Sequence, residues 1–222
     1  MTLHPLGFAL LAVGATQALP CDLLARCLTV VAGRIWPPGA AALARLAQQL
    51  DRPGRTATLG GCILHRTAAR VSVAREPALA EAEVELEPGA SSCWDGRFLV
   101  TLAQAPGPLR LRRLGADGRA QLGVAARQAA RRLPGAAVRA LPSLWRAATL
   151  VWHPLGAPEA FPDMAVRAEA RFTTPVPLVG APFAAANVVS LPGPLIYRAG
   201  GASRPPTSGP RARGASLTRL RQ

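Results

Sequence analysis

The sequence predicts an α+β protein: an N-terminal helical pair, then a small, mostly antiparallel β domain with one packed helix, then a disordered tail. Apolar residues recur every three or four positions over residues 19–50 and at every second position in several later runs. From residue 191 onward Gly, Pro, Ser, Ala and Arg dominate. We therefore expect a helical subdomain at residues 1–53, the α+β domain at 54–189 and a disordered basic tail at 190–222.

Two short helices are expected between residues 19 and 50. Apolar side chains follow helical spacing over residues 23–31, directly after Asp22, which is a candidate N-cap. Pro37 and Pro38 interrupt this pattern, and leucines restart it over residues 43–50. The segment is therefore predicted to be a helical hairpin.

Strands are predicted from residue 56, where the apolar period changes to two. Runs at 59–65 and 71–75, separated by a short polar turn, predict a β-hairpin. Gly60 and Gly61, inside the first run, indicate a bulge or a close backbone approach. A phosphate cradle is not expected there, because no helix starts after the two glycines.

Acidic residues gather just after this hairpin. Five glutamates lie between residues 76 and 87 and alternate with apolar residues, which indicates a solvated edge rather than converging metal ligands. Asp95 and Gly96 then predict a tight turn into a strand at 97–102. Asp95 is interpreted as a turn residue and not as a catalytic acid.

The next stretch combines a strand with a helix. Leucine and arginine alternate over residues 109–112, which predicts a strand with its arginines on one face. Asp117 is expected to cap a helix that runs to Leu133. Two further strands are predicted at 149–152 and 165–172, and the folded part is expected to end between residues 183 and 189.

The charge of the chain is one-sided. All 26 basic residues are arginine, only 12 residues are acidic, and the formal net charge is +14. A GC-rich genome would explain arginine in place of lysine, but not the positive excess. Between residues 103 and 158 nine arginines accompany the single acid Asp117, an imbalance that predicts contact with nucleic-acid phosphates. The candidate nucleic-acid-binding residues are Arg97, Arg110, Arg112, Arg113, Arg119, Arg127, Arg131 and Arg132.

Several kinds of chemistry are excluded or poorly supported. The chain contains no lysine, so it has neither a Walker-type phosphate loop nor a Schiff-base nucleophile. Its four cysteines form no C-x-x-C pair and its three histidines are scattered, so no zinc site is expected and the cysteines are typical of a reducing compartment. We expect a cytoplasmic protein with no catalytic, cofactor-binding or metal-binding residues of its own.

The first twenty residues could also be interpreted as an export signal. Their apolar centre resembles an export signal, but the basic n-region is missing and Pro20 precedes the cysteine. No run approaches the roughly 20 apolar residues that span a bilayer, so no membrane partner is expected. An exported or surface protein is therefore kept as an alternative that rests on this segment alone.

Six short motifs carry a resemblance to a known family. They are Gly33 with Trp36-Pro37-Pro38, L-G-G-C at 59–62, R-E-P at 75–77, W-D-G-R-F at 94–98, L-R-R-L-G at 111–115 and A-L-P-S-L-W at 140–145. In this order, between residues 5 and 183, they resemble the post-catalytic, tRNA-contacting C-terminal part of tRNA(Ile)-lysidine synthases. The resemblance implies tRNA as partner. It also implies a family chemistry in which ATP and Mg²⁺ serve to adenylate the wobble cytidine of tRNA(Ile) before lysine displaces AMP.

The ATP chemistry of that family depends on an S-G-G-x-D-S loop in an N-terminal PP-loop ATPase domain, and no such string occurs in this sequence. We therefore expect the tRNA-binding portion of a lysidine synthase-like protein, with no ligase activity alone and a separate PP-loop ATPase domain as a further partner. A stand-alone basic RNA-binding module and a non-functional truncated relic are the alternatives. With one Tyr, five Phe and four Trp, mostly in apolar runs, binding through shape and phosphates is expected rather than base stacking.

Overall fold

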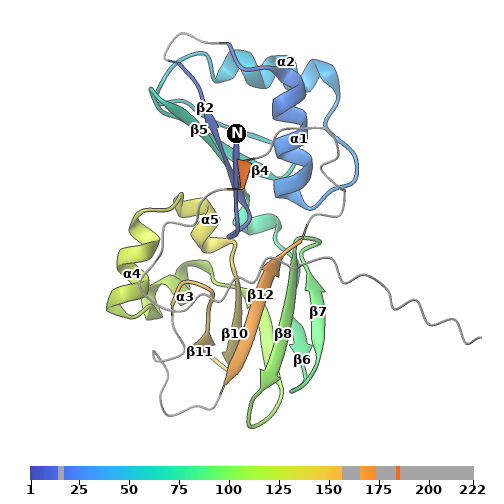
Figure 1. Ribbon diagram of the computed structural model, residues 1–222, viewed down its shortest axis with the longest axis vertical. Helices are drawn as coiled ribbons and strands as arrows, with labels where there is room; N and C mark the ends of the chain where they lie inside the picture. Colours follow the sequence, from blue (N-terminus) through green and yellow to red (C-terminus); the bar gives the residue numbers. More distant parts are fainter. Residues whose placement is uncertain (15–17, 157–165, 174–183, 186–222) are drawn as a thin grey trace, which may run out of the picture.

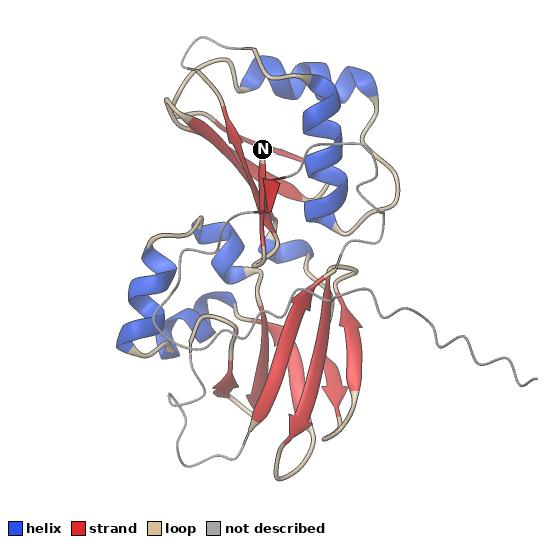
Figure 2. Ribbon diagram, in the orientation of Figure 1, coloured by secondary structure: helices blue, strands red, loops and turns tan. Residues whose placement is uncertain are grey.

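The computed structural model describes residues 1–14, 18–156, 166–173 and 184–185, and it confirms the predicted α+β class (Figure 1). The chain forms two lobes that meet end to end, each with its own sheet structure and helices (Figure 2). We call residues 1–75, with the short strand at 184–185, the N-lobe and residues 76–173 the C-lobe, because the two large hydrophobic clusters divide near residue 75. The predicted tail at 190–222 lies outside the described residues.

The N-lobe is built on one six-stranded sheet in the order β13-β1-β2-β5-β4-β3. Its strands are β1 (Thr2–His4), β2 (Phe8–Ala12), β3 (Thr56–Leu59), β4 (Cys62–Arg66), β5 (Arg70–Arg75) and β13 (Ala184–Ala185). The pair β1 and β13 is parallel and all other pairs are antiparallel. The sequence pattern predicts neither β1 nor β2, so the boundary expected at residue 53 separates segments that share one sheet.

Two helices cover one face of this sheet, and the sequence predicts both as helices but not their packing on strands. They are α1 (Cys21–Ala32) and α2 (Ala40–Gln49), whose apolar sides pack on alternate residues of β2, β4 and β5. Asp22 is not the N-cap: Pro20 holds that position and Asp22 lies in the first turn, where its charge favours the helix dipole. The buried Arg66 donates to the carbonyl oxygens of Leu50 (2.7 Å) and Gly14 (2.9 Å) and so ties the end of α2 to the sheet.

The predicted β-hairpin is confirmed as β4 and β5, and the structure adds β3 in front of it. Gly60 and Gly61 are not a bulge within one strand. They are the two-residue turn between β3 and β4, with φ of 62° and 82°, a left-handed conformation that glycine adopts without steric cost. The predicted close approach is also present, because a Cβ at Gly61 would collide with the Arg75 guanidinium.

The C-lobe is a two-sheet sandwich with helices against one side. One sheet has the order β11-β10-β9-β6 and the other β12-β8-β7. The first contains β6 (Val84–Leu86), β9 (Leu109–Arg113), β10 (Pro142–Arg146) and β11 (Thr149–Trp152). The second contains β7 (Ser91–Trp94), β8 (Phe98–Gln104) and β12 (Arg167–Phe172). Alternate residues of β8, including Val100 and Leu102, pack against Leu111 and Leu144 of the facing sheet.

Three short helices replace the single helix that the sequence predicts. They are α3 (Gly115–Gln121), α4 (Val124–Arg131) and α5 (Gly135–Arg139). Asp117 lies inside α3 rather than at a cap, and an extended Leu122 with Gly123 separates α3 from α4. We call residues 115–139 the helical layer. It lies along the β10 and β11 side of the sandwich, where Gly118 meets the buried indole ring of Trp145 (Figure 1).

The two lobes share a small apolar contact. Phe8 and Ala74, on the N-lobe sheet face opposite α1, pack against Ala137 of α5. A short 3-10 turn, η1 (Pro77–Leu79), carries the chain from β5 into the C-lobe beside this contact.

Candidate nucleic-acid interface

The three predicted arginines of β9 lie where the alternation places them, but carboxylates already hold two of them. The guanidinium of Arg110 lies 3.7 Å from Glu83, and that of Arg112 lies 3.6 Å from Glu83 and 2.7 Å from Asp117. Arg112 also stacks 3.7 Å over the ring of Trp145. Arg112 is therefore a structural cation that fixes Trp145 and the start of α3.

Arg113 borders a surface of mixed charge. Its guanidinium donates to the carbonyl oxygen of Pro77 (2.6 Å). Arg112 and Arg113 line a hollow of about 220 Å³ together with Glu81 and Glu83. Because a phosphate there would meet carboxylates as well as guanidinium groups, β9 is a poor anion site.

The helical layer has a different balance of charge. Asp117 is its single acid, and the ion pair with Arg112 already engages it. Burial alone would raise the pKa of Asp117, but the hydrogen bond and the charge of Arg112 bring that pKa below its usual value. The carboxylate is thus ionised at neutral pH and directed toward β9.

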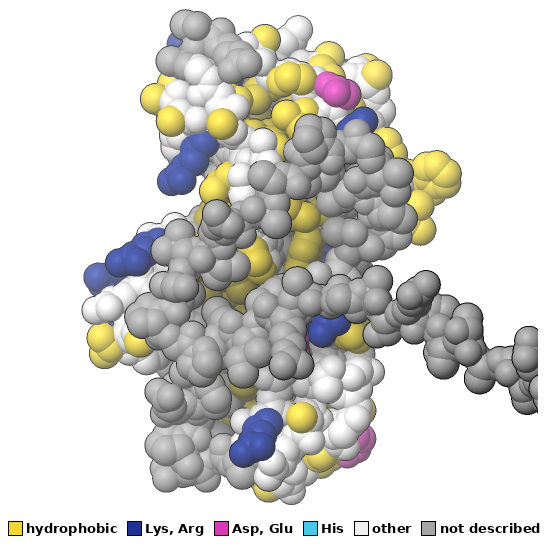
Figure 3. All heavy atoms as spheres, in the orientation of Figure 1, with side chains coloured by type: hydrophobic (Ala, Val, Ile, Leu, Met, Phe, Trp, Pro, Cys, Tyr) yellow, Lys and Arg dark blue, Asp and Glu magenta, His cyan; other side chains and the backbone are white. Residues whose placement is uncertain are grey.

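The remaining arginines of this region form no ion pair within the part of the chain that the structure describes. They are Arg119, Arg127, Arg131, Arg132, Arg139 and Arg146. All are exposed except Arg139, which is half-buried. We call these six residues the basic surface. Figure 3 shows dark blue side chains over the α4 end of the helical layer with no acidic side chain beside them.

The geometry of α4 explains how this surface is presented. Ala126 and Ala130 are buried against the C-lobe, so Arg127 and Arg131, one turn apart, project on the other side. The guanidinium of Arg127 donates to the Leu122 carbonyl oxygen (2.7 Å), which positions it beside the break between α3 and α4. Arg131 and Arg132 also lie at the C-terminal end of α4, where the helix dipole favours cations.

Two members of the basic surface were not among the predicted residues. Arg139 lies in α5 and Arg146 ends β10, and the sequence pattern predicts neither element. The count of nine arginines over residues 103–158 includes both of them, so this count was the sequence signal that could have identified them.

Arg97, the first of the predicted residues, is in the wrong place to touch RNA. Its side chain is 1% exposed, and it lies between the two lobes with Asp95 and Arg75. Both guanidinium groups bind the one carboxylate: Arg97 Nη2 lies 2.7 Å from Asp95 Oδ2, and Arg75 Nη2 lies 2.9 Å from Asp95 Oδ1. Burial lowers the pKa of Arg97, and the charge of Asp95 opposes that shift. We call Arg75, Asp95 and Arg97 the buried triad.

Backbone carbonyl groups from both lobes complete the triad. Arg97 donates to the oxygens of Gly7 (3.4 Å) and Ala140 (3.2 Å). Arg75 donates to Gly61 (3.2 Å) and to Leu79. Asp95 does lie in the tight turn that the sequence predicts, with φ of 52°, and its carboxylate is also the centre of the inter-lobe contact.

The thiols and histidines form no alternative site. Burial raises the pKa values of Cys27 and Cys62 to about 12, so both stay as thiols at neutral pH. Among the residues described, no three His, Cys, Asp or Glu side chains come together as metal ligands. No helix within the described ranges is long and apolar enough to cross a membrane.

Comparison with known proteins adds no relative. No family model, curated protein or solved structure matches this chain.

Proposed function

We propose that this protein binds RNA through the phosphate backbone and that the basic surface makes the contact. The observation that carries the proposal is the set of six arginines with no acidic partner in the described structure. Like charges without acidic partners repel one another, and a polyanion that releases its counterions relieves the repulsion. Arginine also binds phosphate oxygens in a bidentate manner.

tRNA is the RNA that the proposal favours, with the cytoplasm as its compartment. The support is the six-motif resemblance to lysidine synthases, two motifs of which meet in the buried triad: R-E-P supplies Arg75, and W-D-G-R-F supplies Asp95 and Arg97. On this proposal the chain contributes tRNA contact, and a separate PP-loop ATPase domain supplies the ATP chemistry.

The salt dependence of tRNA affinity tests the phosphate contact. We expect the logarithm of the association constant to fall linearly with the logarithm of salt concentration, and each lost phosphate contact to reduce the slope by nearly one. Replacing Arg127, Arg131 and Arg132 together with glutamine should therefore reduce the slope by about 2 to 3.

A matched variant controls for net charge. Arg45, Arg55 and Arg70 are exposed arginines of the N-lobe with no ion pair in the described part of the chain, and their replacement with glutamine removes the same three charges. This control should keep most of the slope. An equal loss in both variants would show that net charge, and not the basic surface, drives binding, and a flat salt response would refute phosphate contact.

A separate assay tests the proposal that this chain has no ligase activity alone. Purified protein with ATP, lysine and tRNA should form no lysidine, and addition of a PP-loop ATPase domain with an S-G-G-x-D-S loop should be required for product. Lysidine formed by this chain alone would overturn that part of the proposal and leave the RNA-binding part unaffected.

A further inference from the structure

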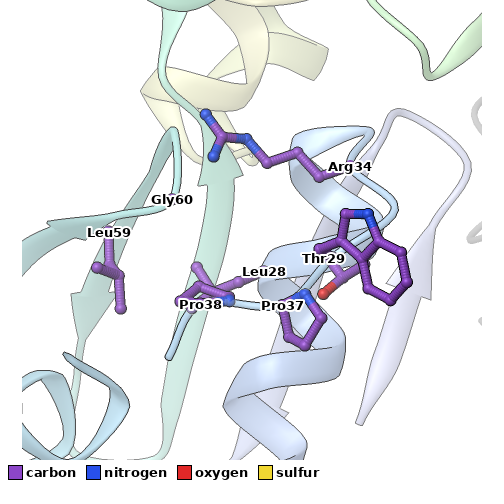
Figure 4. Close-up of a pocket in the computed structure, with 8 residues that line it drawn as sticks. Leu28, Thr29, Arg34, Pro37, Pro38, Leu59 and Gly60 are labelled. Atoms are coloured by element: carbon purple, nitrogen blue, oxygen red, sulfur yellow. The ribbon is translucent and has the colours of Figure 1, made fainter. Parts of the chain in front are cut away.

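The loop between α1 and α2, residues 33–39, exposes the largest apolar side chains of the N-lobe surface that the structure describes. Trp36 is 80% exposed and Ile35 is 64% exposed. Beside them lies a hollow of about 390 Å³, a volume in the range of small-ligand sites. Figure 4 shows its lining: Leu28 and Thr29 from α1, the loop residues including Arg34, and the turn with Leu59 and Gly60.

The walls of the hollow are pre-formed. Pro37 and Pro38 restrict the backbone of the loop, and the backbone N–H of Arg34 donates to the Thr29 carbonyl oxygen (3.0 Å) at the end of α1. The opposite wall is the β3–β4 turn, where a Cβ at Gly60 would lie 3.3 Å from Pro38. Ligand binding therefore requires little free energy to order the site.

The chemistry of the hollow is aromatic and cationic. Trp36 lines it, and the Arg34 side chain extends over it from the loop toward the Gly60 side (Figure 4). Among the described residues no acidic side chain lines the hollow and none forms an ion pair with Arg34. An indole ring and a guanidinium plane both stack on nucleobases, and the guanidinium also attracts the attached phosphate.

We propose that this hollow binds an unpaired nucleotide of single-stranded RNA, with the base stacked on Trp36 and the phosphate held by Arg34. The site goes beyond the proposed function, because the basic surface needs only phosphates whereas the hollow needs an exposed base. The two sites are separate: the α1–α2 loop and α4 project from different sides of the molecule (Figure 1). It also departs from the expectation that base stacking is absent.

The test uses the full chain and a pyrimidine-rich RNA hexamer, which has no secondary structure. The hexamer should quench tryptophan fluorescence, and Trp36→Ala should abolish most of the quenching and weaken affinity about tenfold, as expected for one lost base stack. Trp36→Phe should restore affinity to within about threefold of the natural protein, because a second aromatic ring can stack. Arg34→Gln should weaken binding and reduce its salt slope by about one.

Ile35→Ala is the matched control. Ile35 is the exposed neighbour of Trp36 but does not line the hollow, so its replacement should change hexamer affinity by less than about twofold. Hexamer affinity that is the same for Trp36→Ala and the natural protein overturns the inference. A dimer that is seen in sedimentation for the natural protein and is lost in Trp36→Ala also overturns the inference, because the hollow would then hold a second copy of the chain.

The two proposals fail independently. Trp36→Ala should leave the salt slope of tRNA binding unchanged, and the triple variant of α4 should leave quenching by the hexamer unchanged. If the natural protein is quenched by the hexamer but shows no salt-dependent tRNA binding, the basic surface alone is refuted. If it binds tRNA with the expected salt dependence but the hexamer causes no quenching, the hollow alone is refuted.

Discussion

The buried triad and the basic surface use the same side chain for opposite purposes. Between the lobes two arginines share the carboxylate of Asp95, and their remaining N–H groups reach backbone oxygens. On the basic surface six arginines, five of them exposed, have no ion-pair partner in the described ranges, and the one acid of the region is engaged by Arg112. The placement of the few acids therefore decides which arginines are structural and which are available to a ligand.

The largest expected effect comes from removing the acid of the triad. Asp95→Asn keeps a residue that tolerates positive φ but leaves two buried guanidinium groups without a counter-charge, so the free energy of unfolding should fall by about 3–5 kcal/mol. Urea denaturation measures this loss. A loss below about 1 kcal/mol would place the triad among ordinary surface ion pairs.

The second largest effect concerns the protonation of His153, because its buried site disfavours the charged imidazolium. His153 is 2% exposed, its Nδ1 accepts from the Leu155 N–H (3.2 Å), and burial lowers its pKa to about 4. Because the unfolded chain binds this proton near pH 6.5, the free energy of unfolding should fall as the pH drops from 6.5 to 4, by about 3 kcal/mol.

The pH effect is isolated by subtraction. His153→Asn should remove this component of the pH dependence, whereas the same change at the exposed His65 should not. Denaturation curves at pH 4, 5.5 and 7 are sufficient, and identical pH profiles for the natural protein and His153→Asn would contradict the assignment.

A third prediction separates the two kinds of arginine directly. Arg97→Gln should lower the free energy of unfolding by about 2 kcal/mol, because it removes hydrogen bonds to Gly7 and Ala140, yet leave the salt slope of tRNA binding unchanged. Arg131→Gln should change stability by less than about 0.5 kcal/mol but reduce the salt slope by nearly one. The opposite pattern would exchange the roles of the two regions.

The smallest effect is expected at Asp117. The carboxylate is half exposed, so Asp117→Asn should cost less than about 1 kcal/mol despite its short ion pair with Arg112. The same change adds one positive charge near the helical layer and should therefore strengthen tRNA binding slightly at low salt. Weaker binding would mean that Asp117 organises the basic surface rather than limiting it.

Local patterns predicted the elements whose signals are local. The helical pair, the β4–β5 hairpin, the turn at Asp95 and the strand with Arg110 and Arg112 follow from periodicity and turn chemistry. The strands at the N-terminus did not, because the apolar run of β2 shows no alternation and its partner β5 lies some sixty residues later. The break at Leu122 was missed because Gly123 reads equally as a tolerated helix residue.

The candidate site was predicted in part for the same reason. Charge counting identified the region of the basic surface, since it depends on composition alone. It could not exclude Arg97, because the role of that residue depends on Arg75 and on backbone oxygens from both lobes, which only the fold brings together. Trp36 lies between the two predicted helices, but the sequence does not reveal that its side chain stays exposed, because that depends on how the loop packs.

The contact between Gly33 and Gly96 has a consequence for how the molecule unfolds. A methyl group at Gly33 would lie 2.6 Å from Arg97 Cγ and 2.7 Å from the Asp95 carbonyl oxygen, and one at Gly96 would lie 2.9 Å from the Gly33 oxygen. The end of α1 and the β7–β8 turn thus touch main chain to main chain, and no side chain separates the two lobes at this point. The two lobes therefore cannot swing apart without breaking the triad, and heat should melt them in a single cooperative transition.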